Sequence, residues 1–342
     1  MSFELIGEIP LPETIREMHP VTPEMQKIKA RRDAEIRDIF LRKSNKMLLI
    51  IGPCSAHNED AVCEYVSRLA KLQDEVNDKL VLCQRVYTNK PRTTGEGYKG
   101  MAHQPDPEKD PDLVEGIVAI RKMHIRAFCE SGLTAADEML YPGNFPYLED
   151  VLSYVAVGAR SVENQEHRLT ISGLDVPAGM KNPTGGDISV MLNAIRAAQI
   201  PHEFTYNRWI ARTEGNPLAH AILRGYVDAS GRSFPNYHYE DLAFISEQYM
   251  SRGLENPILI VDTNHNNSNK QFAEQPRIGL EVMRSRQSSN EIRDIVRGMM
   301  VESYLVEGSQ GVEDGVFGKS ITDPCLGWVD SERFVKDLAE RV

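Results

Sequence analysis

The chain has 342 residues, of which 41% are hydrophobic and 26% are charged, an ordinary composition for a soluble globular protein. Its formal net charge of −11 argues against a nucleic-acid-binding protein. An acidic protein also repels anionic small molecules unless cations gather locally to bind them. No apolar stretch approaches the roughly 20 residues needed to cross a bilayer, so we expect no membrane association.

The five cysteines are odd in number, widely spaced and without a C-x-x-C motif; they are Cys54, Cys63, Cys83, Cys129 and Cys325. This usage is typical of a chain kept reduced and not of a disulfide framework. The first 20 residues lack the basic and apolar regions of a signal peptide. We therefore expect a cytoplasmic protein.

The N-terminal segment differs in character from the rest of the chain. Residues 1–20 are proline-rich and mixed in polarity, which predicts an extended arm. Thr22 can cap a helix and Pro23 suits its first position, so a helix is expected over 22–42. We expect an N-terminal arm and helix over residues 1–45, ahead of a catalytic domain over residues 46–342.

After residue 45, strand and helix patterns alternate along the chain. The expected strands are 47–51, 80–87, 134–139, 155–160, 177–181, 219–224, 257–262 and 295–302. The expected helices are 58–76, 112–130, 145–153, 187–199, 238–252, 270–286 and 330–341. The connection over 161–173 is short, and residues 203–207 with 209–214 predict a β-hairpin inserted before the sixth strand.

Many of these strands are apolar without alternation, which indicates a parallel sheet covered on both faces. Eight such strands favour closure into a (β/α)8 TIM barrel, here with an N-terminal helical arm and an inserted hairpin. The alternative is a doubly wound open sheet. The sequence lacks the G-x-G-x-x-G and G-x-x-x-x-G-K-[ST] motifs of its nucleotide-binding versions.

Six cationic residues lie at or just beyond the expected C-terminal ends of strands: Arg85, Lys90, Arg92, Arg160, Lys181 and Arg224. Each one alone is best explained as a solvated surface charge. If the barrel closes, however, all six converge on one face of an acidic protein. Because guanidinium groups match phosphate and carboxylate oxygens geometrically, the set predicts anionic substrates.

A second set comes after the first, seventh and eighth strands, which are neighbours in a closed barrel. Its members are Cys54 in GPCS, His265 in DTNHNNSNK, Glu302 in MVES and Asp323 in SITDPC. A thiolate, an imidazole and two carboxylates suit a divalent transition metal such as Mn, Fe, Co or Zn. Singly, His265 could be a turn residue, Glu302 a strand-end charge and Asp323 a helix cap.

Several motifs, in order and spacing, resemble the type I 3-deoxy-D-arabino-heptulosonate 7-phosphate (DAHP) synthases. They are GPCS at 52–55, RVYTNKPRTT at 85–94, GAR at 158–160, KN at 181–182, ILRG at 222–225, DTNHNNSNK at 262–270, MVES at 300–303 and GKSITDPCLGW at 318–328. The resemblance runs from about residue 45 to the end. It implies condensation of phosphoenolpyruvate with erythrose 4-phosphate and release of phosphate, at the entry to the shikimate pathway.

The resemblance also implies a role for each residue of the two sets. Cys54, His265, Glu302 and Asp323 match the metal ligands of the family, and the metal would polarise the aldehyde oxygen. Arg85, Arg160, Lys181 and Arg224 match the phosphoenolpyruvate contacts. Lys90 matches a lysine between the substrates, and Arg92 with Thr93 matches the erythrose 4-phosphate contacts. Lys90, Lys181 and His265 are the expected catalytic residues, and a homodimer or homotetramer is expected.

The chain departs from the family pattern at several loops. Thr263 stands where an aromatic residue is usual, the loop TTGEGYKG is longer by one residue, and residues 104–112 differ. Asp175 and Tyr206 replace smaller residues at positions that the family links to feedback by aromatic amino acids. We therefore expect a filled pocket and weak or absent inhibition by Phe and Tyr.

Two other functions remain open at this point. A 3-deoxy-octulosonate 8-phosphate synthase shares the barrel and the phosphoenolpyruvate chemistry but acts on arabinose 5-phosphate. The KPRT motif argues against it, since that family has Asn-Arg in place of Pro-Arg. A catalytically silent regulatory barrel would require lost ligands, and every ligand position is filled.

Overall fold

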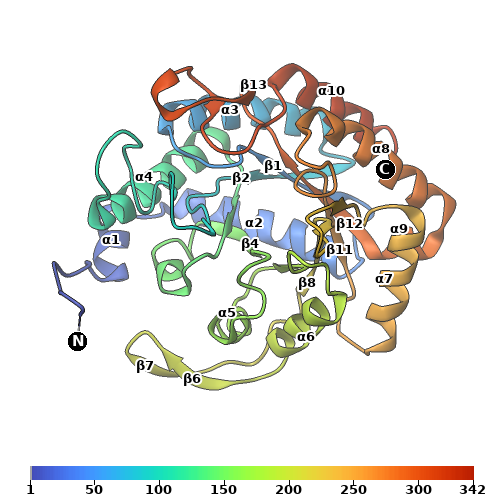
Figure 1. Ribbon diagram of the computed structural model, residues 1–342, viewed down its shortest axis with the longest axis horizontal. Helices are drawn as coiled ribbons and strands as arrows, with labels where there is room; N and C mark the ends of the chain where they lie inside the picture. The colour runs from blue at the N-terminus through green and yellow to red at the C-terminus, as the bar shows by residue number, and fades with distance from the viewer. Residues whose placement is uncertain (1) are drawn as a thin grey trace.

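The computed structural model describes residues 2–342, and its core is a closed barrel of eight parallel strands surrounded by helices (Figure 1). The barrel strands are β1 (Met47–Gly52), β2 (Leu80–Arg85), β3 (Ala135–Glu138), β4 (Leu152–Val157), β5 (Ala178–Lys181), β8 (Ala219–Leu223), β11 (Leu259–Asp262) and β12 (Val296–Glu302). They follow one another around the barrel, with β12 paired to both β1 and β11. The predicted (β/α)8 barrel is thereby confirmed.

Helices connect the strands and form the outer layer (Figure 1). The α-helices are α1 (Pro12–Met18), α2 (Pro23–Phe40), α3 (Glu59–Val76), α4 (Leu113–Ser131), α5 (Gln165–Ile171), α6 (Ile188–Gln199), α7 (Tyr239–Ser251), α8 (Gln275–Ser288), α9 (Asn290–Ile295) and α10 (Trp328–Ala339). Short 3-10 helices span Pro142–Tyr147 (η1), Phe272–Glu274 (η2) and Val312–Asp314 (η3). Side-chain caps begin several of the helices, as when Asn58 accepts a hydrogen bond from Ala61 N at the start of α3.

The hydrophobic core has two parts because successive side chains of a buried strand point to opposite faces. One set, including Leu49, Leu82 and Val261, packs against the surrounding helices. The other set, including Leu48 and Ile260, fills the barrel together with Ile36, Ile39 and Phe40 of α2. Since α2 thus contributes to the interior core, the N-terminal helix is packed on the barrel.

The chain differs from the sequence expectations mainly around the fourth strand. The helix expected over 145–153 is wrong, because Pro142 and Pro146 restrict this segment to the short turn η1. The strand expected over 155–160 begins earlier, at Leu152, and ends at Val157. Arg160 therefore lies in the turn beyond β4 and does not end the strand.

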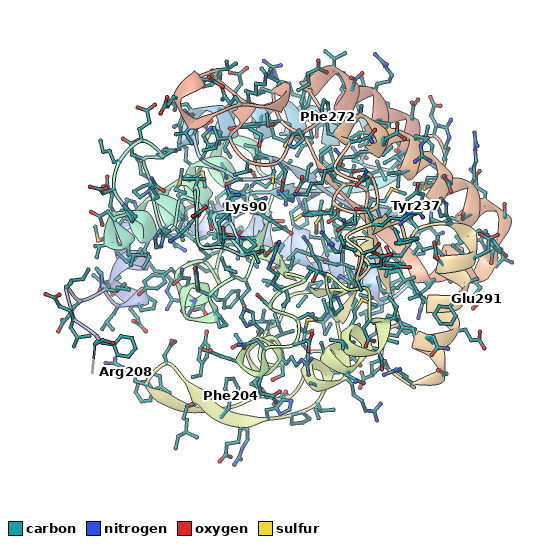
Figure 2. All side chains as sticks on the ribbon, viewed as in Figure 1. Lys90, Phe204, Arg208, Tyr237, Phe272 and Glu291 are labelled. Atoms are coloured by element: carbon teal, nitrogen blue, oxygen red, sulfur yellow. The ribbon has the colours of Figure 1, made fainter. Side chains whose placement is uncertain are left out.

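Several small elements were not anticipated from the sequence. They are α1, α9 and two pairs of two- to four-residue strands: β9 (Tyr226–Val227) with β10 (Ser233–Phe234), and β13 (Val306–Ser309) with β14 (Lys319–Ser320). The expected hairpin is confirmed as β6 (Glu203–Tyr206) paired with β7 (Trp209–Arg212). It extends away from the barrel, with Phe204 and Arg208 at the edge of the molecule (Figure 2). No described helix is long and apolar enough to span a membrane.

The packing of α10 on α8 gives a prediction about stability. Gly279 of α8 faces Phe334 of α10, and a Cβ at Gly279 would lie 2.3 Å from the buried phenyl ring. We expect Gly279→Ala to lower the free energy of unfolding by ~1–3 kcal/mol through overpacking, although Ala favours a helix by about 1 kcal/mol over Gly. Thermal and denaturant unfolding measure the change. Adding Phe334→Leu should recover part of the loss, and equal stability of Gly279→Ala and the unsubstituted chain would contradict this account.

Candidate active site

A polar cavity opens at the C-terminal ends of the barrel strands. It has a volume of about 520 Å³. Its walls include almost every site residue predicted from the sequence: Cys54, Arg85, Lys90, Arg92, Thr93, Arg160, Lys181, Arg224, His265 and Asp323. The one predicted residue that does not line it, Glu302, is buried at the end of β12. Since parallel strands all end at this mouth, closure of the barrel brings residues far apart in sequence together.

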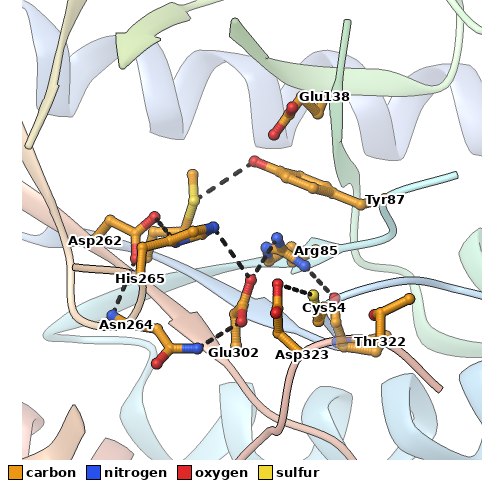
Figure 3. A network of polar contacts seen from close by, with 12 residues as sticks. Cys54, Arg85, Tyr87, Glu138, Asp262, Asn264, His265, Glu302, Thr322 and Asp323 are labelled. Atoms are coloured by element: carbon orange, nitrogen blue, oxygen red, sulfur yellow. Dashed lines mark hydrogen bonds and ion pairs between the residues drawn. The ribbon is translucent and has the colours of Figure 1, made fainter. Parts of the chain in front are cut away.

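The predicted metal ligands lie together at the ends of β1, β12 and β11 (Figure 3). Ligand atoms of Cys54, Glu302 and Asp323 all lie within 4.8 Å of one another. His265 lies at the margin of this group, with Nε2 3.9 Å from Glu302 Oε1. Its backbone is left-handed, with φ of 47°, where the chain turns out of β11. The structure thus brings three predicted ligands together and places the fourth beside them.

Hydrogen bonds fix both oxygens of the Glu302 carboxylate. Arg85 NH2 donates to Oε1 over 2.9 Å, and Asn264 Nδ2 donates to Oε2 over 2.6 Å. The Gln275 side chain accepts from the backbone N–H of Glu302 and donates to its carbonyl. These contacts hold the carboxylate in a single orientation, toward Cys54 and Asp323.

Two lysines surround the Asp323 carboxylate. Lys90 Nζ lies 2.8 Å from both Asp323 Oδ2 and Cys54 Sγ, and Lys270 Nζ lies 3.1 Å from Asp323 Oδ1. Although burial acts to raise it, the pKa of Asp323 is held below its usual range by Lys90 and Lys270. Burial and the Glu302 charge raise the pKa of the Cys54 thiol, against the opposing effect of Lys90. The chain therefore places an ionised carboxylate, a sulfur and an ammonium group in direct contact.

The deeper part of the cavity is cationic and is built over an aromatic ring. The Arg85 guanidinium lies 3.7 Å from the centre of the Tyr87 ring, and Lys181 Nζ lies 5.7 Å from it. Lys181 Nζ is 3.4 Å from Glu138 Oε2 and 3.7 Å from Asp262 Oδ2. Burial acts to raise the pKa of Glu138, but Lys181 and Arg85 lower it overall. Two carboxylates thus hold Lys181 at the floor of the cavity.

The outer part of the cavity is formed by the loop after β2 and the turn after β4. Arg160 Nε donates to Thr93 Oγ1 over 2.9 Å, and Arg92 Nε donates to the Tyr98 carbonyl over 2.9 Å. Arg224, at the end of β8, donates to the Asn266 side chain and has no carboxylate in ion-pair contact among the described residues. The guanidinium groups of Arg92, Arg160 and Arg224 therefore face the cavity without an ion-pair contact to any carboxylate of residues 2–342.

Sequence reasoning missed several residues of this site: Tyr87, Glu138, Asp262, Asn264 and Lys270. Asp262 lies 2.8 Å from His265 through Oδ2 and Nδ1, so it can orient the imidazole. Signals for some of them were present, since Asp262, Asn264 and Lys270 belong to the DTNHNNSNK motif and Glu138 ends an expected strand. Their importance arises from contacts across the barrel, which single motifs do not reveal.

A second cavity, of about 470 Å³, lies between α5, η1 and the β6–β7 hairpin. Tyr206 and Asp175 both line it. Tyr206 forms part of the wall and does not fill the space, so the expectation of a pocket blocked by this side chain is wrong. The carboxylates of Glu149, Asp175 and Glu214 on its walls give it an acidic character.

The known proteins with a similar sequence belong to one family of enzymes. Residues 21–336 match the model of the DAHP synthetase I family. The chain is 38% identical to the Phe-sensitive phospho-2-dehydro-3-deoxyheptonate aldolase of Escherichia coli K12, covering 98% of this chain and 95% of that protein. It is 37% identical to the Trp-sensitive enzyme of Enterobacter agglomerans, over 98% and 96% of the two chains.

Comparison with solved structures leads to the same family. The phospho-2-dehydro-3-deoxyheptonate aldolase from Francisella tularensis SCHU S4 superposes with a TM-score of 0.91 at 29% sequence identity, covering 100% of this chain and 98% of that one. A fold alone does not establish a function, but here the motifs, the cavity and the near full-length similarity agree. The chain therefore belongs to the DAHP synthetase I family.

Proposed function

We propose that the protein catalyses the condensation of phosphoenolpyruvate with D-erythrose 4-phosphate and water to give DAHP and phosphate, the first step of aromatic amino acid biosynthesis. The observation that carries the proposal is that a Cys–Glu–Asp cluster lies beside a cavity lined by seven Lys and Arg side chains, in a chain from this family. Two anionic substrates require such a concentration of positive charge in a protein with a net charge of −11.

The cations divide the cavity into two parts with different roles. We assign phosphoenolpyruvate to Arg85 and Lys181 in the deep part, together with Arg160 and Arg224 of the adjoining outer part, because these groups can bind its carboxylate and phosphate. We assign the phosphate of erythrose 4-phosphate to Arg92 and Thr93 in the outer loop. Lys90 lies between the two parts, so its ammonium group can contact both substrates.

Cys54, His265, Glu302 and Asp323 would hold a divalent cation, and the mixed sulfur, nitrogen and oxygen donors fit Mn, Fe, Co or Zn. Such an ion supplies a Lewis acid for the aldehyde oxygen of the sugar. The position of His265 at the margin of the cluster is consistent with a ligand that completes the set, because Asp262 already orients its ring.

The remaining chemistry falls to the residues around phosphoenolpyruvate. In the reaction, C3 of the enol bonds to the aldehyde carbon, water adds at C2, and the C2–O bond to phosphate breaks. Arg85 and Arg224 stabilise the departing phosphate. Lys181 Nζ and Glu138 Oε2, 3.4 Å apart, form a pair that can hold the proton released by the attacking water.

We further propose that the protein acts as a homodimer or homotetramer in the cytoplasm. Phe3, Leu5 and Ile6 of the N-terminal arm are 86%, 95% and 90% exposed, which supports burial of the arm against another copy. The five cysteines are all free, which fits a reducing compartment.

The substrate and metal assignments predict one set of assay results. Phosphate release from phosphoenolpyruvate should require erythrose 4-phosphate, stop in excess chelator and return with Mn, Co or Fe. Arabinose 5-phosphate should support little release, because the KPRT motif at 90–93 is the one that resembles the family acting on erythrose 4-phosphate. Cys54→Ser should weaken Mn binding measured by equilibrium dialysis, with Cys129→Ser, an exposed cysteine outside the site, as the control. Full activity of metal-free protein, or release with no sugar specificity, would refute these assignments.

The roles of the cations assigned to phosphoenolpyruvate predict large kinetic effects. Lys181→Met and Arg160→Ala should each lower kcat/KM at least about tenfold, because each removes a charge that binds a substrate anion. The melting temperature of Arg160→Ala should stay close to that of the unsubstituted protein, since the Arg160 side chain lies on the cavity wall. Lys109→Met, which removes an exposed lysine outside the cavity, is the matched control. Unchanged kinetics in either variant would exclude that residue from the site.

Feedback inhibition is the remaining expectation from the sequence. We predict weak inhibition by Phe and Tyr, now for an electrostatic reason, because the Asp175 carboxylate lines the second cavity and would repel the carboxylate of an amino acid. Initial rates with each aromatic amino acid at saturating metal measure this. Asp175→Asn should then strengthen inhibition. Half-inhibition at micromolar Phe or Tyr in the unsubstituted protein would contradict the prediction.

A further inference from the structure

The loop after β2 carries three of the residues assigned to the substrates, yet it is long and leaves the barrel wall. Lys90, Arg92 and Thr93 all lie on this loop and face the cavity. A loop must hold such side chains in a fixed place to bind a substrate productively, since a displacement of about 1 Å can reduce turnover by roughly 10²-fold. The contacts at the base of the loop therefore determine its function.

The hydrogen-bond ladder between β2 and β3 changes at the base of this loop. Gln84 N donates to Thr134 O over 3.1 Å, and Val86 N donates to Ala136 O over 3.0 Å. A regular parallel ladder would continue from residue 88 to the carbonyl of residue 138. That carbonyl accepts instead from Leu140 N over 2.9 Å, and Thr88 N donates to the side chain of Asp137 over 3.0 Å.

The Asp137 carboxylate, 4% exposed, accepts three hydrogen bonds at this point. Oδ1 accepts from the backbone N–H groups of Thr88 and, over 2.7 Å, of Glu138, while Oδ2 accepts from the Thr88 hydroxyl. The Thr88 carbonyl in turn accepts from Ala102 N over 3.1 Å at the far end of the loop. Thr88 therefore joins both ends of the loop, and Asp137 fixes Thr88.

The same base is closely packed. Gly100 has φ of 99°, and a Cβ there would lie 2.4 Å from the Thr88 carbonyl oxygen. Within the loop, Lys90 N donates to Lys99 O over 2.9 Å, so the outgoing segment that carries Lys90 is hydrogen-bonded to the segment that returns to the barrel. A shift of Thr88 would accordingly move Lys90, which touches both Cys54 and Asp323.

We propose that Asp137 is a positioning residue for the sugar phosphate, because it replaces a main-chain acceptor of the barrel and so sets the point where the loop carrying Lys90 and Arg92 leaves the sheet. The inference rests on the substrate roles proposed above. Asp137 itself need not touch either substrate. Its adjacent residue Glu138 points to Lys181, so one strand end supports both parts of the cavity.

The contact between Asp137 and Thr88 depends on hydrogen-bond acceptors at residue 137 more than on a negative charge there. Burial raises the pKa of Asp137 to about 7, against the opposing effect of the hydrogen bonds from Thr88. An asparagine side chain would offer Oδ1 to both backbone N–H groups and could donate to the Thr88 hydroxyl oxygen. Asn should therefore preserve the geometry, while Ala would leave the buried N–H of Thr88 without an acceptor.

The test compares Asp137→Ala, Asp137→Asn and Thr88→Val in the metal-loaded, full-length protein. We expect Asp137→Ala to raise KM for erythrose 4-phosphate about tenfold or more and to lower kcat, while binding of phosphoenolpyruvate, measured by titration calorimetry, changes less than about threefold. Asp137→Asn should restore KM to within about threefold of the unsubstituted value. Thr88→Val, which keeps the backbone donor, should fall between the two.

Asp150→Asn controls for a general loss of stability, since it alters another carboxylate that pairs with the buried Arg121, just ahead of the N-terminal end of β4. It should lower the melting temperature without raising KM for the sugar. Unchanged sugar KM in Asp137→Ala, or equal weakening of both substrates in that variant, overturns the positioning role. Were the proposed reaction itself wrong, the unsubstituted protein would show no turnover with erythrose 4-phosphate, a result distinct from these.

Discussion

The buried ion pair between Arg85 and Glu302 joins the two halves of the site. Arg85 ends β2 and Glu302 ends β12, on either side of β1, and their side chains are 2% and 1% exposed. Removing one partner of such a pair leaves an uncompensated buried charge and costs about 3–5 kcal/mol. Each member of the pair also belongs to one part of the site. Arg85 faces the cavity over Tyr87, and Glu302 faces Cys54 and Asp323.

This pair can exist only where the barrel closes. The eight strands bring their C-terminal ends to one mouth, while Ile36, Ile39 and Phe40 of α2 pack with the interior side chains. The interior below the mouth is mainly apolar, with the hydrogen-bonded pair of Tyr154 and His220 packed among its apolar side chains, and the charged residues of the site lie in the layer above it. In this layer burial raises the pKa of Cys54, whereas the charges of Lys90 and Lys270 outweigh the effect of burial on Asp323 and lower its pKa.

The arrangement also explains how an acidic protein can bind two anions. Most of its acidic residues lie outside the cavity, whereas the carboxylates at the site are paired with cations: Glu302 with Arg85, Asp323 with Lys90, and Glu138 and Asp262 with Lys181. Arg92, Arg160 and Arg224 remain in addition to these pairs. The local excess of positive charge is therefore produced by position and not by composition.

The sequence by itself determined the barrel and most of the site, because buried parallel strands have a strong apolar pattern and the chemical residues come directly after them. It failed over 145–160, where proline-restricted turns resemble a short helix and a late strand. Only the tertiary structure decided that Tyr206 lines a cavity without filling it, that His265 stands beside the cluster of Cys54, Glu302 and Asp323, and that Asp137 and Glu138 support opposite parts of the site. Local sequence carries propensity and strand order, whereas these features depend on distances between segments that meet only when the barrel closes.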